Sequence, residues 1–312
     1  MTTTEREGGS CRGPGRNRPG RNCPGQNRLR RKRRLLLWLL LLPALAVGGV
    51  FWFRWQCWGM TVTHTEAELS GLPGEFDGCK IVHISDLHGH QYGEGSADLL
   101  AAVREQRPDL IMITGDLVDQ EGQFQTVPAL ARGLASVAPT YYVTGNHEWG
   151  LGTAKVKELK NLLSQCGVTV LSNEYAVLER NGAQIVLAGV DDPNGYADQT
   201  TPEELRARIG DEAPGLFTLL LAHRNDRFDQ YAAAGFDFVM SGHAHGGIVR
   251  LPFTDGLIST GMKLFPQWTS GLYTLGDSTL FVSRGLGNNT VPVRGFRLFN
   301  RPELAVITLR AA

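Results

Sequence analysis

The sequence of 312 residues predicts an α/β layered fold behind an N-terminal transmembrane helix. Short β-branched runs alternate with helix-like runs from Lys80 to Met240, a pattern typical of strands and helices packed in layers. Leu35–Phe53 is 19 residues long and carries no charge. As a helix it would reach about 28 Å, close to the hydrocarbon thickness of a bilayer.

The N-terminal tail, residues 1–34, is basic and poor in apolar side chains. It holds eleven Lys and Arg residues against Glu5 and Glu7, which leaves 20 basic and 29 acidic residues in the rest of the chain. Such a tail cannot bury enough apolar surface to fold alone, so we expect it to be disordered and cytoplasmic. A basic arm could instead bind nucleic acid. The acidic body argues against a nucleic-acid surface, so nucleic acid is not the expected partner.

Leu35–Phe53 is predicted to anchor the protein in the cell membrane as a single span. By the positive-inside rule, the basic run Arg30–Arg34 before it keeps the tail in the cytoplasm and sends the body outward. Two alternatives remain open. Ala44–Ala46 resembles the cleavage site of a signal peptide, and the paired arginines resemble a twin-arginine export signal. All three place the body outside the cytoplasm, whereas an inverted topology would place it inside.

The body is predicted to begin after a linker over residues 54–79, where glycines and a proline interrupt any regular element. One domain is expected over residues 80–312. Its predicted strands are Lys80–Ile84, Asp109–Ile113, Thr140–Val143, Gln184–Val190, Phe217–Leu221, Phe236–Met240, Gly271–Leu275, Thr279–Ser283 and Leu304–Leu309. Its predicted helices are Ser96–Gln106, Val127–Ser136, Ala154–Gln165, Pro202–Ile209 and Asp226–Ala234.

Polar blocks of one kind follow five of the predicted strands. They contain Asp86 and His88, then Asp116, Asn146 with His147, His223, and finally His243 with His245. Open α/β sheets bind ligands at the carboxyl ends of their strands, so five such blocks on one sheet should meet at one place. Each block alone has a plainer interpretation, such as a turn Asp, a helix cap or a buried core His. Their order along the chain favours a shared site.

The blocks offer nitrogen and oxygen donors and no Cys ligand, which suits two adjacent divalent ions sharing one carboxylate. Such ion pairs commonly cleave phosphate esters. Asp116 is the candidate bridging carboxylate. His147 follows Asn146 directly and should point another way, where it could donate a proton to a leaving group. We expect Glu148 to orient the His147 imidazole, and Asp119 to act as a cap or a hydrogen-bond acceptor near the site.

The ordered series DLH, GDLVD, GNHE, AHRND and GHAHGG resembles the calcineurin-like metallophosphoesterase superfamily over residues 80–310. The later segments LFPQWTSGLY, FVSRGLGNN and RLFNRPEL look like its bacterial membrane-anchored branch. The resemblance implies a four-layer α/β/β/α sandwich and a catalytic domain over residues 80–312. It also implies a centre of two divalent ions, drawn from Mn, Fe, Zn or Co, whose identity the sequence does not select.

The resemblance assigns a role to each donor. The first ion would take Asp86, His88, Asp116 and His245, and the second would take Asp116, Asn146, His223 and His243. His147 would be the catalytic acid or transition-state stabiliser. A hydroxide bridging the ions would attack phosphorus directly, without a phosphoenzyme.

The implied function is metal-dependent hydrolysis of phosphate esters. Phosphodiesters and pyrophosphate-linked substrates, including lipid-linked ones, are favoured because the anchor holds the domain near lipid headgroups. An alternative is a membrane-tethered scaffold that binds metal without turnover. A further alternative makes the basic tail a nucleic-acid arm on a structural body. The substrate pocket is expected near Asp191–Tyr196 and Leu251–Trp268, from their loop character.

Overall fold

The computed structural model describes residues 24–196, 199–251, 254–259, 262–288 and 295–312. The first part of the predicted tail, residues 1–23, lies outside the described residues. The chain divides into two compact units, Met1–Phe51 and Trp52–Ala312. The last residues of the long N-terminal helix therefore belong to the second unit.

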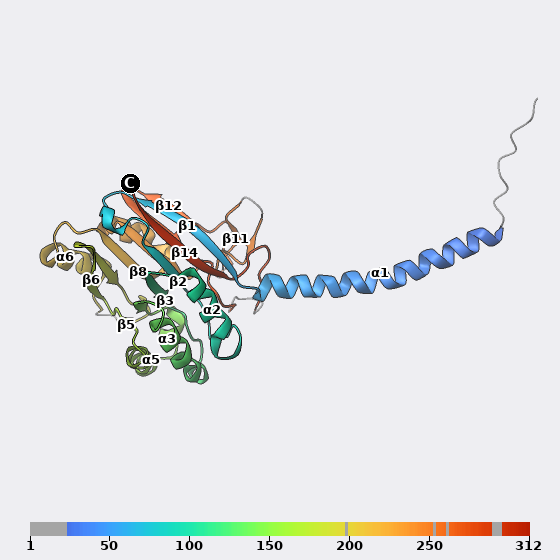
Figure 1. Cartoon of the computed structure of the whole chain (residues 1–312), viewed down its shortest axis with the longest axis horizontal. Coiled ribbons are helices and arrows are strands. Elements are labelled where there is room, and N and C mark those ends of the chain that lie inside the picture. The colour runs from blue at the N-terminus through green and yellow to red at the C-terminus, as the bar shows by residue number, and fades with distance from the viewer. Residues whose placement is uncertain (1–23, 197–198, 252–253, 260–261, 289–294) are drawn as a thin grey trace, which may run out of the picture. The chain divides into compact units, whose positions relative to one another are not determined.

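The N-terminal helix, α1, extends over Pro24–Trp58 and is longer than the predicted span (Figure 1). Its part Arg31–Trp58 is long and apolar enough to cross a membrane, by length and composition. Residues 24–34 were expected to be disordered, but they are helical. Leu, Gln, Arg and Lys are good helix formers, and extending an existing helix costs much less than starting one.

The first sheet has six strands in the order β1-β14-β2-β3-β4-β5. They are β1 (Thr61–Leu69), β14 (Glu303–Ala311), β2 (Lys80–Ile84), β3 (Leu110–Thr114), β4 (Thr140–Val143) and β5 (Thr169–Val170). β2 to β5 run parallel to one another, whereas β14 lies antiparallel to β2 and parallel to β1. In Figure 1, β1, β14, β2 and β3 lie side by side in this order.

The second sheet also has six strands, in the order β12-β13-β9-β8-β7-β6. They are β12 (Gly271–Leu275), β13 (Ser278–Val282), β9 (Phe238–Gly242), β8 (Thr218–Arg224), β7 (Ala183–Gly189) and β6 (Glu174–Arg180). β13, β9, β8 and β7 are parallel, and β12 and β6 close the two edges antiparallel. A separate two-stranded ribbon joins β10 (Val249–Arg250) to β11 (Gly256–Ile258).

The two sheets pack face to face through an apolar core that includes Ile81 and Met112 of the first sheet and Leu219 and Met240 of the second. The outer face of the first sheet is covered by α2 (Ala97–Gln106), α3 (Val127–Ala135) and α5 (Thr153–Gln165). The outer face of the second is covered by α6 (Pro202–Glu212) and α7 (Phe228–Ala234). The predicted four-layer α/β/β/α sandwich is therefore confirmed.

Residues 54–79 do not form the predicted linker. They contain the end of α1, the whole of β1 and a short 3₁₀ helix, Gly74–Phe76. β1 pairs with β14 along its full length, from Thr61 to Leu69. The segment TVTHTEAEL is too polar to resemble a buried strand, because an edge strand leaves many of its side chains in water.

Candidate metal centre

The predicted donors come from both sheets and not from one. Asp86 and His88 follow β2, and Asp116 follows β3. Asn146 begins a short helix, α4 (Asn146–Gly150), directly after β4. The remaining donors belong to the second sheet: His223 lies near the end of β8, and His243 and His245 follow β9. The expectation of a single sheet is wrong, but the face-to-face packing still brings the strand ends together.

The first group of donors is Asp86, His88 and His245, all of them buried. The Nε2 atoms of His88 and His245 lie 3.0 Å apart. His245 Nε2 lies 3.4 Å from Asp86 Oδ1, and His88 Nε2 lies 3.9 Å from Asp116 Oδ2. Ring nitrogens and carboxylate oxygens that converge on one point fit a divalent cation, which would draw together groups that otherwise repel.

The second group surrounds His223. Its Nε2 lies 3.3 Å from Asp116 Oδ2, 3.1 Å from Asn146 Oδ1 and 3.2 Å from His243 Nδ1. Asp116 Oδ2 is thus close to His88 of the first group and His223 of the second. All seven predicted donors meet here, with Asp116 between the two groups. Four imidazoles, carboxylates and one amide form a donor set suited to borderline divalent metals.

Two of the imidazoles are held by acceptors on the side away from the centre. His223 Nδ1 donates to the carbonyl of Thr114 at 2.7 Å. His88 Nδ1 lies 2.6 Å from Asp119 Oδ1. Such partners fix the ring so that Nε2 presents its lone pair to a metal. The predicted acceptor role of Asp119 is confirmed.

His147 lies at the open side of the centre, with about a third of its side chain exposed. Its Nε2 is 3.9 Å from Asp116 Oδ2, and its Nδ1 is 2.9 Å from Asp119 Oδ1. Burial alone would lower the pKa of His147, but the hydrogen bond to Asp119 and the charge of Asp116 raise it. The ring is thus accessible and biased toward its protonated form.

Glu148 does not orient the His147 ring, contrary to the prediction. Its buried carboxylate accepts hydrogen bonds from the backbone N–H groups of Asp116, Leu117 and Gly145, at 2.9, 2.6 and 2.8 Å. Burial, followed by the charge of Asp116, raises the pKa of Glu148 to about 7. Glu148 therefore connects the loops after β3 and β4. Asp119, and not Glu148, is the carboxylate that contacts His147 Nδ1.

Two arginines contact ligand candidates, and neither was predicted. Arg297 is fully buried, and its Nη2 donates to His245 Nδ1 at 3.1 Å and to the carbonyl of Gly287 at 2.7 Å. Arg224 Nη1 lies 3.2 Å from His243 Nε2, while its Nε donates to Asp192 Oδ2 at 2.8 Å. Asp192 belongs to the loop predicted to border the substrate pocket, so that loop is connected to the centre through Arg224.

A chain of hydrogen bonds reaches Asp86 from the core between the sheets. Ser85 Oγ donates to Asp86 Oδ2 at 2.5 Å, and Thr114 Oγ1 donates to Ser85 Oγ at 2.9 Å. Thr114 Oγ1 can then only accept from His83 Nε2, which lies 2.7 Å away. His83 is buried, and its Nδ1 has no hydrogen-bond partner among the described residues. Nothing in the sequence around His83 distinguishes it from an ordinary strand residue.

The backbone is strained where the donors lie. Asp86, His88, Asp116, His243 and His245 all have positive φ, between 49° and 65°. Residues other than glycine rarely adopt this region, and its cost of about 1–3 kcal/mol is tolerated mainly at functional sites. Positive φ at five of the seven candidate donors is therefore consistent with a functional site, although Asp and His adopt this region more readily than most residues.

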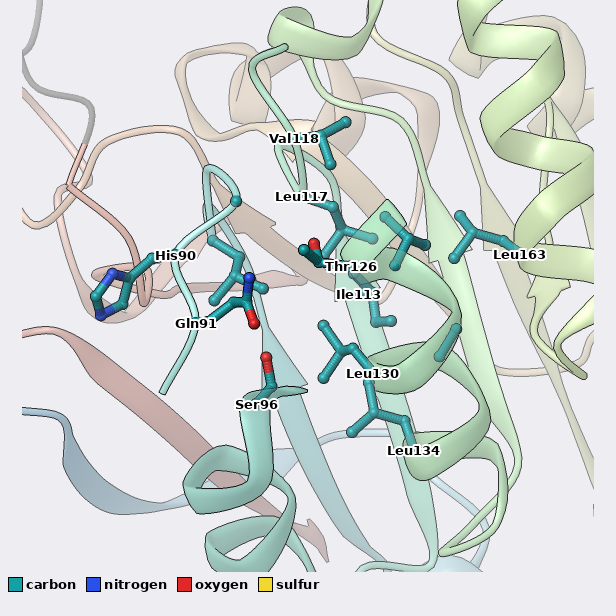
Figure 2. A pocket seen from close by; sticks show the side chains of 14 residues that line it. His90, Gln91, Ser96, Ile113, Leu117, Val118, Thr126, Leu130, Leu134 and Leu163 are labelled. Atoms are coloured by element: carbon teal, nitrogen blue, oxygen red, sulfur yellow. The ribbon is translucent and has the colours of Figure 1, made fainter. Parts of the chain in front are cut away.

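A small enclosed cavity under α3 is separate from the centre (Figure 2). Leu117, Leu130, Leu134 and Leu163 line it on the apolar side, and Gln91 and Ser96 approach from the other. Its free volume of about 20 Å³ has room for roughly one water molecule. It is a packing space beneath the ligand loop and does not resemble a substrate site.

Comparison with known proteins agrees with this geometry. A family model described as calcineurin-like phosphoesterase matches residues 79–247. The uncharacterized metallophosphoesterase YkuE of Bacillus subtilis is 32% identical over 278 residues, covering 86% of this chain and 92% of YkuE. The phosphodiesterase YaeI of Escherichia coli is 32% identical over 238 residues, covering 74% of this chain and 82% of YaeI.

A similar protein from cattle is described as a transmembrane protein with metallophosphoesterase domain. It is 31% identical over 265 residues, covering 80% of this chain and 57% of its own length. The similarity to these relatives extends beyond the matched family segment, because 80% or more of this chain is aligned in two of the three cases.

Proposed function

The chain belongs to the calcineurin-like phosphoesterase family, and from this premise we propose that it is a dinuclear metal-dependent phosphoesterase. The observation that carries the proposal is the convergence of two donor groups on one carboxylate, Asp116. Asp86, His88 and His245 would hold one ion with it. Asn146, His223 and His243 would hold the other. Mn, Fe, Zn and Co all accept such donors, so the metal remains to be identified.

When bound, the two ions would supply a deprotonated water as nucleophile and neutralise charge on the phosphoryl oxygens. The contribution of this chain is to hold its donors rigid and to move a proton. His147 is exposed enough to meet a substrate, and Asp119 holds its Nδ1. Its Nε2 would donate a proton or hydrogen bond to the departing oxygen. His147 is therefore the proposed catalytic acid.

We further propose that the substrates are phosphodiesters or pyrophosphate-linked compounds, lipid-linked ones among them. One relative is named a phosphodiesterase, and another is described as transmembrane. The apolar helix α1 would anchor the protein in the cell membrane as a single span. The basic run before it favours an extracytoplasmic catalytic domain.

The test is hydrolysis of bis-p-nitrophenyl phosphate by the full chain in detergent, with Mn²⁺ titrated. Asp116→Ala should lose metal-dependent turnover, and the matched surface variant Asp211→Ala should keep it. His147→Ala should bind metal normally but lose about 10²-fold or more in kcat. If the protein bound two ions but hydrolysed none of a panel of mono- and diesters, the esterase proposal would be wrong. The alternative of a membrane-tethered metal-binding scaffold would then be favoured.

A further inference from the structure

A second hollow lies next to the loop that carries His245. Its volume is about 710 Å³ and it is open to solvent. Arg250, which lines it, donates from Nη1 to the carbonyl of Gly246 at 3.1 Å. Gly246 directly follows the candidate ligand His245 in sequence. The hollow therefore contacts the ligand loop, but no candidate ligand is among its lining residues.

The charge of this hollow is mainly positive. Arg250, Arg284 and Arg301 line it, against Asp255 as the acidic residue of the lining. Arg284 pairs with Glu303 at 3.1 Å, and Arg250 lies 3.9 Å from Asp255. Arg250 uses most of its five N–H donors on Gly246, Thr254 and Ser270. Arg284 uses one on Glu303, and Arg301 uses two on the carbonyls of Gly59 and Met60, so both keep donors for a further anion. Arginines gathered in this way suit phosphate, which they bind through paired hydrogen bonds.

The hollow also contains part of the candidate membrane span. Gln56 lines it and belongs to the last turns of α1 within Arg31–Trp58. The guanidinium of Arg301 lies over the Trp55 ring at 3.8 Å and donates to the carbonyls of Gly59 and Met60. Because an arginine of the hollow is fixed to the end of the span, the hollow lies within reach of the headgroup layer.

Two further features indicate the chemistry of an occupant. Gln56 is 7% exposed, and its Oε1 has no hydrogen-bond partner among the described residues. An unpaired amide oxygen calls for a hydroxyl or N–H donor. The rim carries the half-exposed apolar side chains Leu251 and Phe299. Trp52 packs edge-on against Phe299 at 5.8 Å, so this apolar rim continues into α1.

We propose that this hollow binds the headgroup of an anionic glycerophospholipid bearing free hydroxyls, with its phosphate on Arg284 and Arg301. A headgroup hydroxyl would donate to Gln56, and the first acyl carbons would contact Leu251 and Phe299. The membrane placement in this inference rests on the proposed function. Since Arg250 also donates to the carbonyl of Gly246, the occupied hollow would be connected to the His245 loop through this arginine.

The test is native mass spectrometry of the full chain in detergent micelles with three probes. They are dioctanoyl phosphatidylglycerol, dioctanoyl phosphatidylcholine and glycerol 1-phosphate. Phosphatidylglycerol should bind about tenfold or more tightly than phosphatidylcholine, which lacks headgroup hydroxyls and carries a positive charge. Arg284→Gln and Arg301→Gln should each weaken phosphatidylglycerol binding about tenfold. Arg310→Gln, a surface arginine paired with Glu66, should not.

Equal binding of the two lipids by the unaltered chain would overturn the inference, and this comparison needs no variant. Equal binding of glycerol 1-phosphate and phosphatidylglycerol would also overturn it, in favour of a soluble phosphate ligand. Hydrolysis of bis-p-nitrophenyl phosphate is measured in the same samples. Turnover without lipid selectivity would contradict the lipid site but not the esterase function. Lipid selectivity without turnover would contradict the esterase function but not the lipid site.

Discussion

At the scale of single residues, the sequence indicated the seven candidate donors that the structure brings together, but not the residues that contact them from behind. Asp86 and His88, or His243 and His245, are recognisable because each pair is local in the chain. Arg297 lies far from His245 in sequence, and their contact depends on how the strands pack. The contact of His83 with Thr114 also depends on how two strands pair, so the sequence alone does not reveal it. Glu148 was assigned the wrong partner because its backbone acceptors come from two loops.

The contact of Ser85 with Asp86 leads to the first prediction. Ser85→Ala removes the hydroxyl that donates to Asp86 Oδ2, so the carboxylate loses one of the groups that fix its orientation. The affinity for Mn²⁺ should fall about 10–100-fold, the usual effect of losing such a partner of a ligand. Isothermal titration of the metal-stripped protein measures it. Ser164→Ala on the exposed face of α5 is the control, and an unchanged affinity in Ser85→Ala would contradict the prediction.

The buried His83 predicts a pH dependence of stability. Burial lowers its pKa from 6.5 to about 3. Between these values the unfolded chain binds a proton that the folded chain does not, so stability falls as the pH decreases below 6.5. His83→Gln removes this contribution. The stability difference between the two proteins should change by up to about 1.4 kcal/mol per pH unit in this window. Denaturant unfolding of both proteins at pH 7.5, 6 and 5 measures this difference in unfolding free energy. A difference that stayed constant over these pH values would contradict the prediction.

At the scale of elements, apolar strands and amphipathic helices were predicted well, as was the edge strand β12, but the edge strands β1, β5 and β6 were not. β2, β3, β4, β7, β8 and β9 were identified because buried strands have continuous apolar sequences. β1 and β6 were missed, since both are sheet edges with many exposed polar side chains. The short helix α4, which carries both Asn146 and His147, was not predicted. Helix α1 was predicted too short at both ends.

The turn after β9 provides a prediction for one element. A Cβ added at Gly242 would lie 1.8 Å from Ser85 Oγ and 2.2 Å from Asp86 Oδ2. Gly242→Ala should therefore push the β2 and β9 loops apart and abolish high-affinity metal binding. Gly210→Ala in α6 is the matched control, because its nearest neighbour is 3.7 Å away. That change should stabilise the helix by about 0.5–1 kcal/mol. The metal content of each variant is measured by plasma emission spectroscopy and its stability by thermal unfolding. A Gly242→Ala protein with full metal content would contradict the predicted clash.

At the scale of the whole molecule, strand ends from two sheets supply one centre. Sequence periodicity identifies strands but not the sheet to which each belongs, so a single sheet was the simplest expectation. The return of the chain to place β14 between β1 and β2 was also invisible in the sequence. The residues after α1 consequently belong to the folded domain and not to a linker.

This architecture predicts that the end of α1 supports the centre. The carbonyl of Cys57 accepts a hydrogen bond from the Asn288 amide, whose Oδ1 accepts from Arg297 Nε. Arg297 in turn contacts His245. A protein of residues 60–312 should therefore bind Mn²⁺ about tenfold or more weakly than one of residues 52–312. Titration calorimetry compares them, and equal affinities would show that the helix end is dispensable.

The packing of Trp52–Trp58 against the domain also determines which part of α1 would remain after proteolysis within this helix. A cut after Ala46 would remove the basic residues and most of the apolar helix but leave this segment attached to the domain. The released domain would keep all seven candidate metal ligands. It would also carry exposed aromatic side chains, including Trp52 and Trp55, and so tend to adhere to the membrane surface from which it was released. Such a cut would therefore weaken the attachment of the domain to the membrane without abolishing it.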